Sequence, residues 1–411
     1  MAIIIIMVRQ IQITRDYAKD FNVNKTRLVY GRRKTGKSFY VENFVKYDAY
    51  LFVYRDKSIK NIKTNDSWSF DELKRYILNN KEKTIVIDEF HRLDSSFLDF
   101  LHSIRANNLI LITSSLHFAN SVLSKKSPVL GLIYPIKFKI FTPCEILGFM
   151  AKAVKTDFLE YSILLREPAL LDFFEGGDFK SFLLKYYNFA KYWTIALFGE
   201  IFEDEDRKLT NVYDGIIRAI SLGKSSSGEI SSHLFSNGLI PKDSPGAVSS
   251  YLEILSNIGI IEKKEVYGKR RLFKYALVSS ALDFFFYLNS KYGENVTERE
   301  IIDGWNNKVS FYIESFLESL LSEYYGYEVV KYSYPNKEID VCLKKFKKVE
   351  VIGSVKWKDI SKVNFVQVKQ NLNLDVQNKF LFVKYKGTKK KEEGIFIYDE
   401  KDVIKFCKSF K

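Results

Sequence analysis

The chain has 411 residues, of which 46% are hydrophobic and 16% are aromatic. This composition excludes an intrinsically disordered protein and suits roughly two to four packed domains. Lysine and arginine together number 64 and aspartate and glutamate 50, so the formal net charge is +14. Such a surplus favours a polyanionic partner such as nucleic acid, although solvated lysine-rich surfaces give the same total.

The N-terminal segment and the cysteines indicate in which cellular compartment the protein is expected. The apolar run Ala2 to Met7 is far shorter than the roughly 18 residues that a membrane-spanning helix needs. We expect it to form a strand or to be buried, and we expect no membrane partner. The cysteines Cys144, Cys342 and Cys407 are far apart and match no metal or disulfide spacing. Unpaired thiols fit a reducing compartment, so a cytoplasmic protein is expected.

The first motif along the chain is a phosphate-binding loop. The stretch GRRKTGKSFY follows a short apolar strand, residues 26–30, and leads into a helical pattern, which is the context of a Walker A motif. Two glycines let backbone N–H groups point at phosphates. Lys37 is expected to bridge the β- and γ-phosphates, and the Ser38 hydroxyl to ligate Mg²⁺. The expected nucleotide-binding residues are Gly31, Arg32, Arg33, Lys34, Thr35, Gly36, Lys37, Ser38 and Phe39.

A second strand is expected to supply the acids of the same site. TIVIDE, residues 84–89, is β-branched and ends in Asp88 and Glu89. It lies about 50 residues after the loop, which fits a Walker B strand. We predict that Asp88 holds the Mg²⁺ shell and that Glu89 orients or deprotonates the attacking water, with Lys37 as the catalytic cation.

A third buried strand, residues 109–113, ends in hydroxyl side chains. In ATPases with an extra strand between Walker A and Walker B, a polar residue here contacts the γ-phosphate. Thr113 is our catalytic candidate, with Ser114 and Ser115 as alternatives. An ordinary Ser/Thr turn explains the same pattern.

Together these motifs resemble the archaeal ATPase group within the STAND branch of P-loop ATPases, relatives of AAA+ proteins. The matching segments are GRRKTGKS, VIDEF followed by HRL, LITSS, SPVLG and Glu175-Gly176-Gly177. The resemblance implies a Mg²⁺-dependent ATPase core that binds ATP or ADP, a helical lid, a winged-helix domain and a C-terminal nuclease-like domain. The family motif SPLYGR ends here in Leu132 instead of arginine, so hydrolysis is expected to be slow or to use another arginine.

The expected fold class is therefore α/β, with a P-loop NTPase core on a parallel sheet and three further domains. We place the ATPase core at residues 1–141, the helical lid at 142–208, the winged-helix domain at 209–290 and the nuclease-like domain at 291–411. The lid segment has apolar residues at three- and four-residue spacing, which predicts helices that pack against the nucleotide domain.

Three helical patterns and a basic hairpin predict the winged helix. The third helix follows Pro245-Gly246, and the hairpin turn is YGKRR, residues 267–271. Docking of another protein is the alternative use of such a module. The residues expected to face DNA are Ser249, Ser250 and Tyr251 on the third helix, with Lys269, Arg270 and Arg271 on phosphates.

The C-terminal segment resembles the PD-(D/E)XK nuclease-like domain of the same ATPases. The resemblance implies a divalent-metal site in which Glu314 is the helix acid, Asp340 the strand acid and Lys356 the lysine. The family's G-E-C-K-W reads GSVKW here, so Ser354 replaces the second carboxylate. Glu350 lies on the same face of the strand as Ser354, but four residues of strand separate the two by roughly 13 Å, which is too far to bind the same metal. A degenerate domain that binds DNA or another domain is expected, in preference to a working nuclease.

The predicted function is an ATP-binding and ATP-hydrolysing molecular switch, in which nucleotide occupancy positions DNA-binding parts. Nucleotide and DNA are the expected partners, with a protein partner or a second copy as further options. One alternative is an ATP-regulated, metal-dependent DNA nuclease, which Ser354 opposes. Another is a nucleotide-bound protein-interaction scaffold, which the intact Lys37, Asp88 and Glu89 oppose.

Overall fold

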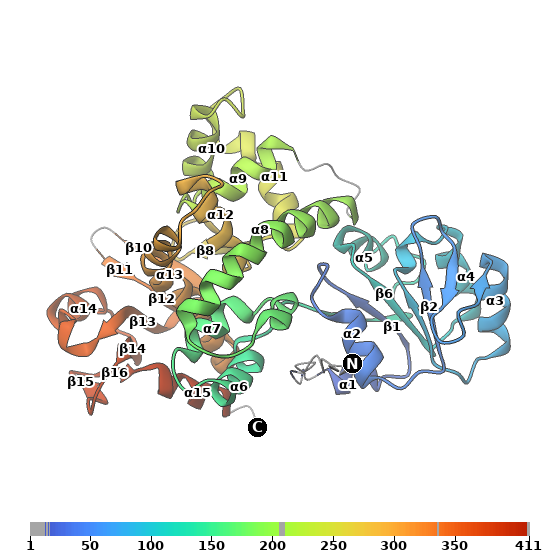
Figure 1. Ribbon diagram of the computed structural model, residues 1–411, viewed down its shortest axis with the longest axis horizontal. Coiled ribbons are helices and arrows are strands. Elements are labelled where there is room, and N and C mark those ends of the chain that lie inside the picture. Colours follow the sequence, from blue (N-terminus) through green and yellow to red (C-terminus); the bar gives the residue numbers. More distant parts are fainter. Residues whose placement is uncertain (1–12, 14, 16, 205–209, 335–336, 409–411) are drawn as a thin grey trace, which may run out of the picture.

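The computed structural model describes residues 13, 15, 17–204, 210–334 and 337–408, which form two lobes (Figure 1). The first lobe contains the phosphate-binding loop, and the second contains everything after β7. The long helix α8 (Phe179–Asp204) reaches from the second lobe toward the first (Figure 1). The expected N-terminal strand at Ala2 to Met7 lies outside the described residues.

The first lobe is built on a seven-stranded sheet with the order β4-β3-β2-β5-β6-β1-β7. Strands β2, β5, β6, β1 and β7 run parallel, whereas β3 and β4 pair antiparallel at one edge. Strand β6 lies between β1 and β5, so the predicted extra strand separates the two nucleotide-binding strands. The strands are β1 (Thr26–Tyr30), β2 (Ala49–Val53), β3 (Ile59–Asn61), β4 (Ser67–Trp68), β5 (Ile85–Asp88), β6 (Leu109–Thr113) and β7 (Ile133–Lys137).

Helices cover both faces of this sheet because successive side chains of a strand point to opposite faces. Leu28 packs in the cluster beneath α3, α4 and α5, whereas the next residue, Val29, packs with α1 and α2. A parallel sheet buried on both faces accounts for the continuous apolar runs in the sequence. The helices are α1 (Ala18–Phe21), α2 (Lys37–Phe44), α3 (Phe70–Asn79), η1 (Phe90–Arg92), α4 (Ser96–Ile104) and α5 (Leu116–Val122).

The second lobe is organised around α13 (Glu298–Tyr325), which contacts α6, α7, α8, α12, α15 and the C-terminal sheet. One hydrophobic cluster runs through all of these helices. The other helices are α6 (Pro143–Ala153), α7 (Phe158–Leu165), η2 (Pro168–Phe173), α8, α9 (Asn211–Ser221), α10 (Ser227–Ser236), α11 (Pro245–Asn257), α12 (Ser280–Tyr292), η3 (Ile360–Lys362), α14 (Phe365–Asn371) and α15 (Glu400–Lys408).

The packing of α6 to α8 differs from the expectation for a lid. Their apolar side chains belong to the cluster of the second lobe, and the nucleotide lobe has two separate clusters. This helical segment contacts the phosphate-binding loop through ion pairs, which are described below. Helical spacing identified these segments as amphipathic but could not tell which lobe their apolar faces would cover.

Helices α9, α10 and α11 and the hairpin β8–β9 follow one another in the predicted order. A capping box between Ser226 and Glu229 starts α10. We call residues 211–277 the helix–hairpin unit. Its strand β8 pairs in parallel with β10, so the hairpin is part of the C-terminal sheet.

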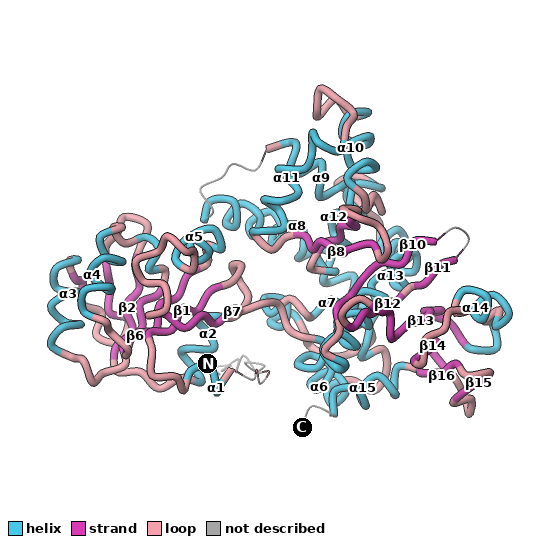
Figure 2. Tube along the Cα trace, turned by 180° about the vertical axis from the view of Figure 1, so that it is seen from behind, coloured by secondary structure: helices cyan, strands magenta, loops and turns pink. Residues whose placement is uncertain are grey.

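That sheet has nine strands, ordered β15-β16-β14-β13-β12-β10-β8-β9, with β11 paired to β10 (Figure 2). A buried ion cluster secures the junction, because Glu318 of α13 pairs with Lys264 of β8 and Lys331 of β10. The strands are β8 (Ile261–Val266), β9 (Phe273–Leu277), β10 (Glu328–Tyr334), β11 (Lys337–Ile339), β12 (Val341–Lys345), β13 (Lys348–Asp359), β14 (Asn378–Tyr385), β15 (Lys391–Glu392) and β16 (Ile395–Tyr398).

The cysteines correct one expectation. Cys144 of α6 and Cys407 of α15 form a disulfide, with their Cα atoms 5.1 Å apart and a sequence separation of 263. Two helices that meet only in the folded chain leave no spacing pattern to detect. The argument for a reducing compartment from unpaired cysteines therefore loses its support, and buried Cys342 is the free thiol.

Within the described residues, no helix has both the length and the apolar character that crossing a bilayer requires.

Candidate nucleotide site

The phosphate-binding loop depends on two glycines. Gly31 follows β1, and a Cβ atom there would lie 2.1 Å from the Phe138 carbonyl oxygen, which no side chain tolerates. Gly36 has φ 85° and immediately precedes α2. A residue with a side chain is strained in that left-handed conformation. The turn therefore closes tightly and aims the N-terminus of α2 into the loop, which is an anion-binding arrangement.

Lys37 occupies the centre of the loop. Its Nζ donates to the carbonyl oxygens of Gly31 at 2.9 Å and Arg32 at 3.1 Å, and its side chain is buried. Thr35 Oγ1 also donates to the Arg32 carbonyl, at 2.8 Å. The ammonium group is thus held where the loop curls, in position to receive phosphate oxygens.

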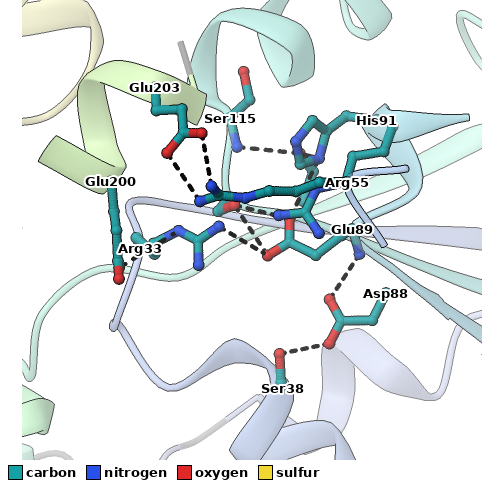
Figure 3. A network of polar contacts seen from close by, with 12 residues as sticks. Arg33, Ser38, Arg55, Asp88, Glu89, His91, Ser115, Glu200 and Glu203 are labelled. Atoms are coloured by element: carbon teal, nitrogen blue, oxygen red, sulfur yellow. Dashed lines mark hydrogen bonds and ion pairs between the residues drawn. The ribbon is translucent and has the colours of Figure 1, made fainter. Parts of the chain in front are cut away.

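The predicted Mg²⁺ ligands lie together. Ser38 Oγ donates to Asp88 Oδ2 at 2.7 Å (Figure 3). Tyr50 donates to the same oxygen at 2.6 Å. Burial, with the Glu89 charge beside it, raises the pKa of Asp88 above its ordinary value. A hydroxyl and a carboxylate are the hard oxygen donors that Mg²⁺ prefers, so these residues fit the ion. Tyr50 was missed because a tyrosine within a strand carries no motif.

Glu89 lies next to Asp88 in a left-handed conformation, with φ 56° and ψ 37°. This strained geometry turns its side chain away from that of Asp88 and toward β6. Ser114 Oγ donates to Glu89 at 2.9 Å. Arg33 Nη2 lies 3.7 Å from Glu89 Oε1 (Figure 3). The carboxylate is therefore held from two sides.

The hydroxyl that contacts the acid is that of Ser114, whereas Thr113 was our first candidate. Thr113 Oγ1 lies 3.0 Å from His91 Nδ1 and accepts the backbone N–H of Ser115. His91 Nδ1 in turn lies 3.4 Å from Glu89 Oε2. Thr113 therefore reaches Glu89 through His91, one step further away than Ser114.

Acids of the second lobe pair with the basic residues of the loop. Arg32 and Glu167 form a 2.5 Å ion pair, with side-chain exposures of 5% and 1%. Glu200 of α8 lies 3.8 Å from Arg33 and 3.9 Å from Lys34 (Figure 3). These contacts join the phosphate-binding loop to η2 and α8, and the spacing of the sequence gave no sign of them.

Two further arginines connect the lobes. Arg15 donates to the Thr35 carbonyl at 2.9 Å and pairs with Glu145 of α6 at 3.2 Å. Arg55, after β2, pairs with Glu203 at the end of α8 at 2.8 Å (Figure 3). Both were missed, because neither lies in a recognisable motif.

Leu132 lies away from this site. It precedes β7, whose first residue Ile133 pairs with Thr26 at the start of β1. The phosphate-binding loop follows the other end of β1, roughly 16 Å away for five residues of strand. An arginine at position 132 would therefore not reach the phosphates of this chain's own loop, and its absence removes no cation there.

The C-terminal candidates Glu314, Asp340 and Lys356 do gather, and Ser354 is bonded to Asp340. Asp340 Oδ2 accepts bonds from Ser354 Oγ at 2.9 Å, the Val355 N–H at 2.6 Å and Lys356 Nζ at 3.4 Å. Burial, then the Asp340 charge, raises the pKa of Glu314 to about 8. Among the residues that the structure describes, no three His, Cys, Asp or Glu side chains are grouped to hold a metal.

The predicted DNA-facing residues divide into two sets. Ser249 and Ser250 are exposed on α11, but Tyr251 packs edge-on against Tyr213 with 5.1 Å between ring centroids. Tyr251 therefore supports the packing of the unit and does not project from it. The hairpin residues Lys269, Arg270 and Arg271 are exposed.

Comparison with known proteins agrees with this geometry. Residues 23–130 match the family described as an AAA domain. A solved structure similar in fold is the Walker-type ATPase PABY2304 of Pyrococcus abyssi, at 17% identity and TM-score 0.50, covering 66% of this chain and 96% of that one.

Weaker matches include Aeropyrum pernix ORC1 solved in complex with DNA, at 16% identity and TM-score 0.28, over 64% of this chain and 86% of that one. Another is Cdc6p of Pyrobaculum aerophilum, at 12% identity and TM-score 0.23, covering 71% of this chain and 91% of that one. No curated protein matches the chain. The match of residues 23–130 shows that the first lobe is a P-loop domain of the AAA type.

Proposed function

We propose that this protein is a molecular switch of the archaeal STAND ATPase type, which hydrolyses ATP with Mg²⁺ and acts on duplex DNA. The observation that carries the proposal is the assembly of Lys37, Ser38, Asp88 and Glu89 in one site under acids of a second lobe. A site that only stored nucleotide would not need an acid held beside the metal ligands.

Each residue has a role in hydrolysis. Lys37 exchanges its carbonyl partners for the β- and γ-phosphates, which the loop N–H groups also bind. Ser38 and Asp88 would hold Mg²⁺, which supplies charge neutralisation when it is bound. Glu89 accepts the proton of the attacking water, and Ser114 keeps its carboxylate aimed. Arg33, beside Glu89, supplies a cation within reach of the same space.

The switch acts through two contacts between lobes. Phosphate entering the loop brings negative charge toward Glu167 and Glu200, which compete with it for Arg32 and Arg33. These acids lie on η2 and α8, so their displacement moves the second lobe.

A second contact begins at the strand end that faces Glu89. Two residues after Ser114 comes Leu116, whose Cδ1 lies 3.3 Å from where a Cβ of Gly259 would be. Gly259 follows α11 in the helix–hairpin unit. A shift of Ser114 is therefore passed to that unit through packed atoms.

DNA is the proposed target because the net charge is +14 and the hairpin exposes three adjacent cations. In this proposal residues 142–208 are the lid, 209–290 a winged-helix domain and 291–411 a nuclease-like domain that binds without cleaving. Ser354, a hydroxyl bonded to Asp340, stands where a second metal-binding carboxylate is needed.

Two measurements test the proposal together, namely the rate of ATP hydrolysis and the movement of the two lobes relative to each other. We expect Mg²⁺-dependent ATP hydrolysis that Lys37→Ala abolishes, and a change in fluorescence transfer between labels on α3 and α14 when ADP replaces ATP. The exposed Lys81→Ala is the matched control. Turnover that persists in Lys37→Ala, or lobes that give the same signal with both nucleotides, would contradict it.

A further inference from the structure

Two basic turns from distant parts of the sequence lie against each other. The hairpin turn of the helix–hairpin unit, residues 267–272, contacts the turn between β12 and β13, residues 345–348. Tyr267 donates its hydroxyl proton to the Lys347 carbonyl oxygen at 3.2 Å. The pairing of β8 with β10 places both turns in one sheet. We call them the paired turns.

The paired turns present a concentrated positive charge. Their cations are exposed, and Lys344 at the base is excluded because Glu265 and Glu328 neutralise it. Among the described residues, the acid that pairs with one of the counted cations is Glu350, 3.9 Å from Lys348. The exposed cations are Lys269, Arg270, Arg271, Lys345, Lys347 and Lys348.

Phe346 stands at the tip of the second turn, between these lysines. Its side chain is 87% exposed, the highest value among the exposed large hydrophobic residues of the described chain. Its φ of 54° lies in the left-handed region, which suits glycine or asparagine at a hairpin turn. The Phe346 side chain does not pack in a core, and phenylalanine is not a residue type that favours this left-handed backbone conformation. Folding therefore does not account for it, and strained exposed residues of this kind occur at functional sites.

We propose that the paired turns form one duplex-DNA-binding surface, in which their cations contact phosphates and Phe346 inserts at a base step. Exposed lysines and arginines are the usual phosphate contacts, and apolar side chains that wedge between base steps are an established way to bend a duplex. Lysine is depleted in protein–protein interfaces, so a protein partner fits this surface less well. The inference rests on the proposed function, because it identifies which surface takes the DNA.

Charge-removal variants test the phosphate contacts. The binding of a fluorescent duplex is measured over a salt series for the full chain and for two triple alanine variants, at Lys345, Lys347 and Lys348 and at Lys269, Arg270 and Arg271. Each triple should lower the slope of log affinity against log salt by about 3. The control replaces Lys389, Lys390 and Lys391, near β15 at the other end of the sheet, and should leave the slope near wild type.

Phe346→Asn tests the wedge without harming the fold. Asparagine tolerates a positive φ, so the thermal midpoint of the protein should stay the same or rise. Duplex affinity should fall ~5-fold or more, as for loss of a stacked aromatic. A duplex carrying 2-aminopurine should brighten with the wild-type chain and not with the variant. Unchanged affinity and unchanged 2-aminopurine signal would overturn the wedge, and so would a lowered thermal midpoint.

The outcomes separate this inference from the proposed function. A wild-type chain that binds no duplex would contradict both the DNA-binding surface and the proposed action on DNA. Duplex binding that weakens at Lys269, Arg270 and Arg271 but not at Lys345, Lys347 and Lys348 would leave DNA as the target and overturn the paired surface. Weakening at both turns, with the control unaffected, would support it.

Discussion

Arg32 of the phosphate-binding loop and Glu167 of the second lobe form a buried ion pair, with 2.5 Å between Arg32 Nη2 and Glu167 Oε1. Within the described part of the chain, Arg32 Nη1 and Glu167 Oε2 are buried without a hydrogen-bond partner. Each charge therefore depends on the other for compensation in a poorly solvated place. Since Arg32 lies where phosphates bind, the pair links nucleotide occupancy to the contact between lobes.

A double-mutant cycle measures this link. Arg32→Ala or Glu167→Ala alone leaves a buried charge unpaired and should lower the free energy of unfolding by about 3 kcal/mol or more. The double variant should lose less than the sum, with a coupling of about 1–3 kcal/mol by urea denaturation. The exposed pair Arg55–Glu203 is the control, with coupling under about 1 kcal/mol. Additive effects at Arg32 and Glu167 would show that the pair does not couple the lobes.

Ser114 and Thr113 should differ in their effect on ATP turnover. Ser114→Ala removes the hydroxyl that holds Glu89, so kcat should fall about ten-fold or more while nucleotide affinity stays within two-fold, about the resolution of such a comparison. Thr113→Val keeps the shape of the side chain and loses the contact with His91, so it should cost less. A steady-state ATPase assay with nucleotide titration checks both. A larger loss in Thr113→Val would place the working hydroxyl at Thr113.

The nucleotide-binding motifs could be predicted because phosphate chemistry demands particular residue types at adjacent positions. Gly31, Lys37 and Ser38 sit in one short stretch, and Asp88 ends a strand whose apolar pattern is plain. The choice between Thr113 and Ser114 was beyond the sequence, since both are hydroxyls at the end of one strand. Only the orientation of each side chain separates them.

The contacts between distant segments could not be predicted. Arg32 meets Glu167 across 135 residues, and β8 joins β10 to make one sheet of two regions that we treated as separate. The Cys144–Cys407 disulfide is of the same kind. Each depends on how whole helices and strands pack, and local composition carries no record of that.

Restoring the missing carboxylate should create a metal site in the C-terminal domain. Ser354 is buried against Asp340, so Ser354→Glu places two acids together and should destabilise the metal-free protein. Millimolar Mg²⁺ or Mn²⁺ should then raise the thermal midpoint of this variant and leave that of wild type unchanged. Ser354→Gln is the uncharged control. An equal metal response in wild type would mean that Glu314 and Asp340 already bind a metal, which revives the nuclease hypothesis.

Glu400 should make stability depend on pH near neutrality. Burial, with the charges of Asp157 and Glu160, raises its pKa to about 7, and the bond from the Leu159 N–H opposes part of this shift. A raised carboxyl pKa favours the protonated form in the fold, so its stabilising effect is complete below pH 4.5 and is lost as pH rises through 7.

Glu400→Gln removes that ionisation and keeps an acceptor for the Leu159 N–H. The variant should match wild type at about pH 4 and exceed it by about 1–2 kcal/mol at about pH 8, measured by urea denaturation. Lys401→Gln, the next residue of α15, is a surface control. A variant that is no more stable than wild type at the higher pH would contradict the assignment.

ATP hydrolysis by the full chain, measured with and without duplex DNA and with Glu89→Gln as the control, tests the central claim most directly. We predict Mg²⁺-dependent turnover that duplex DNA stimulates and that Glu89→Gln abolishes while nucleotide still binds. ATP that binds without being hydrolysed, or turnover that is indifferent to DNA, would contradict a DNA-responsive switch.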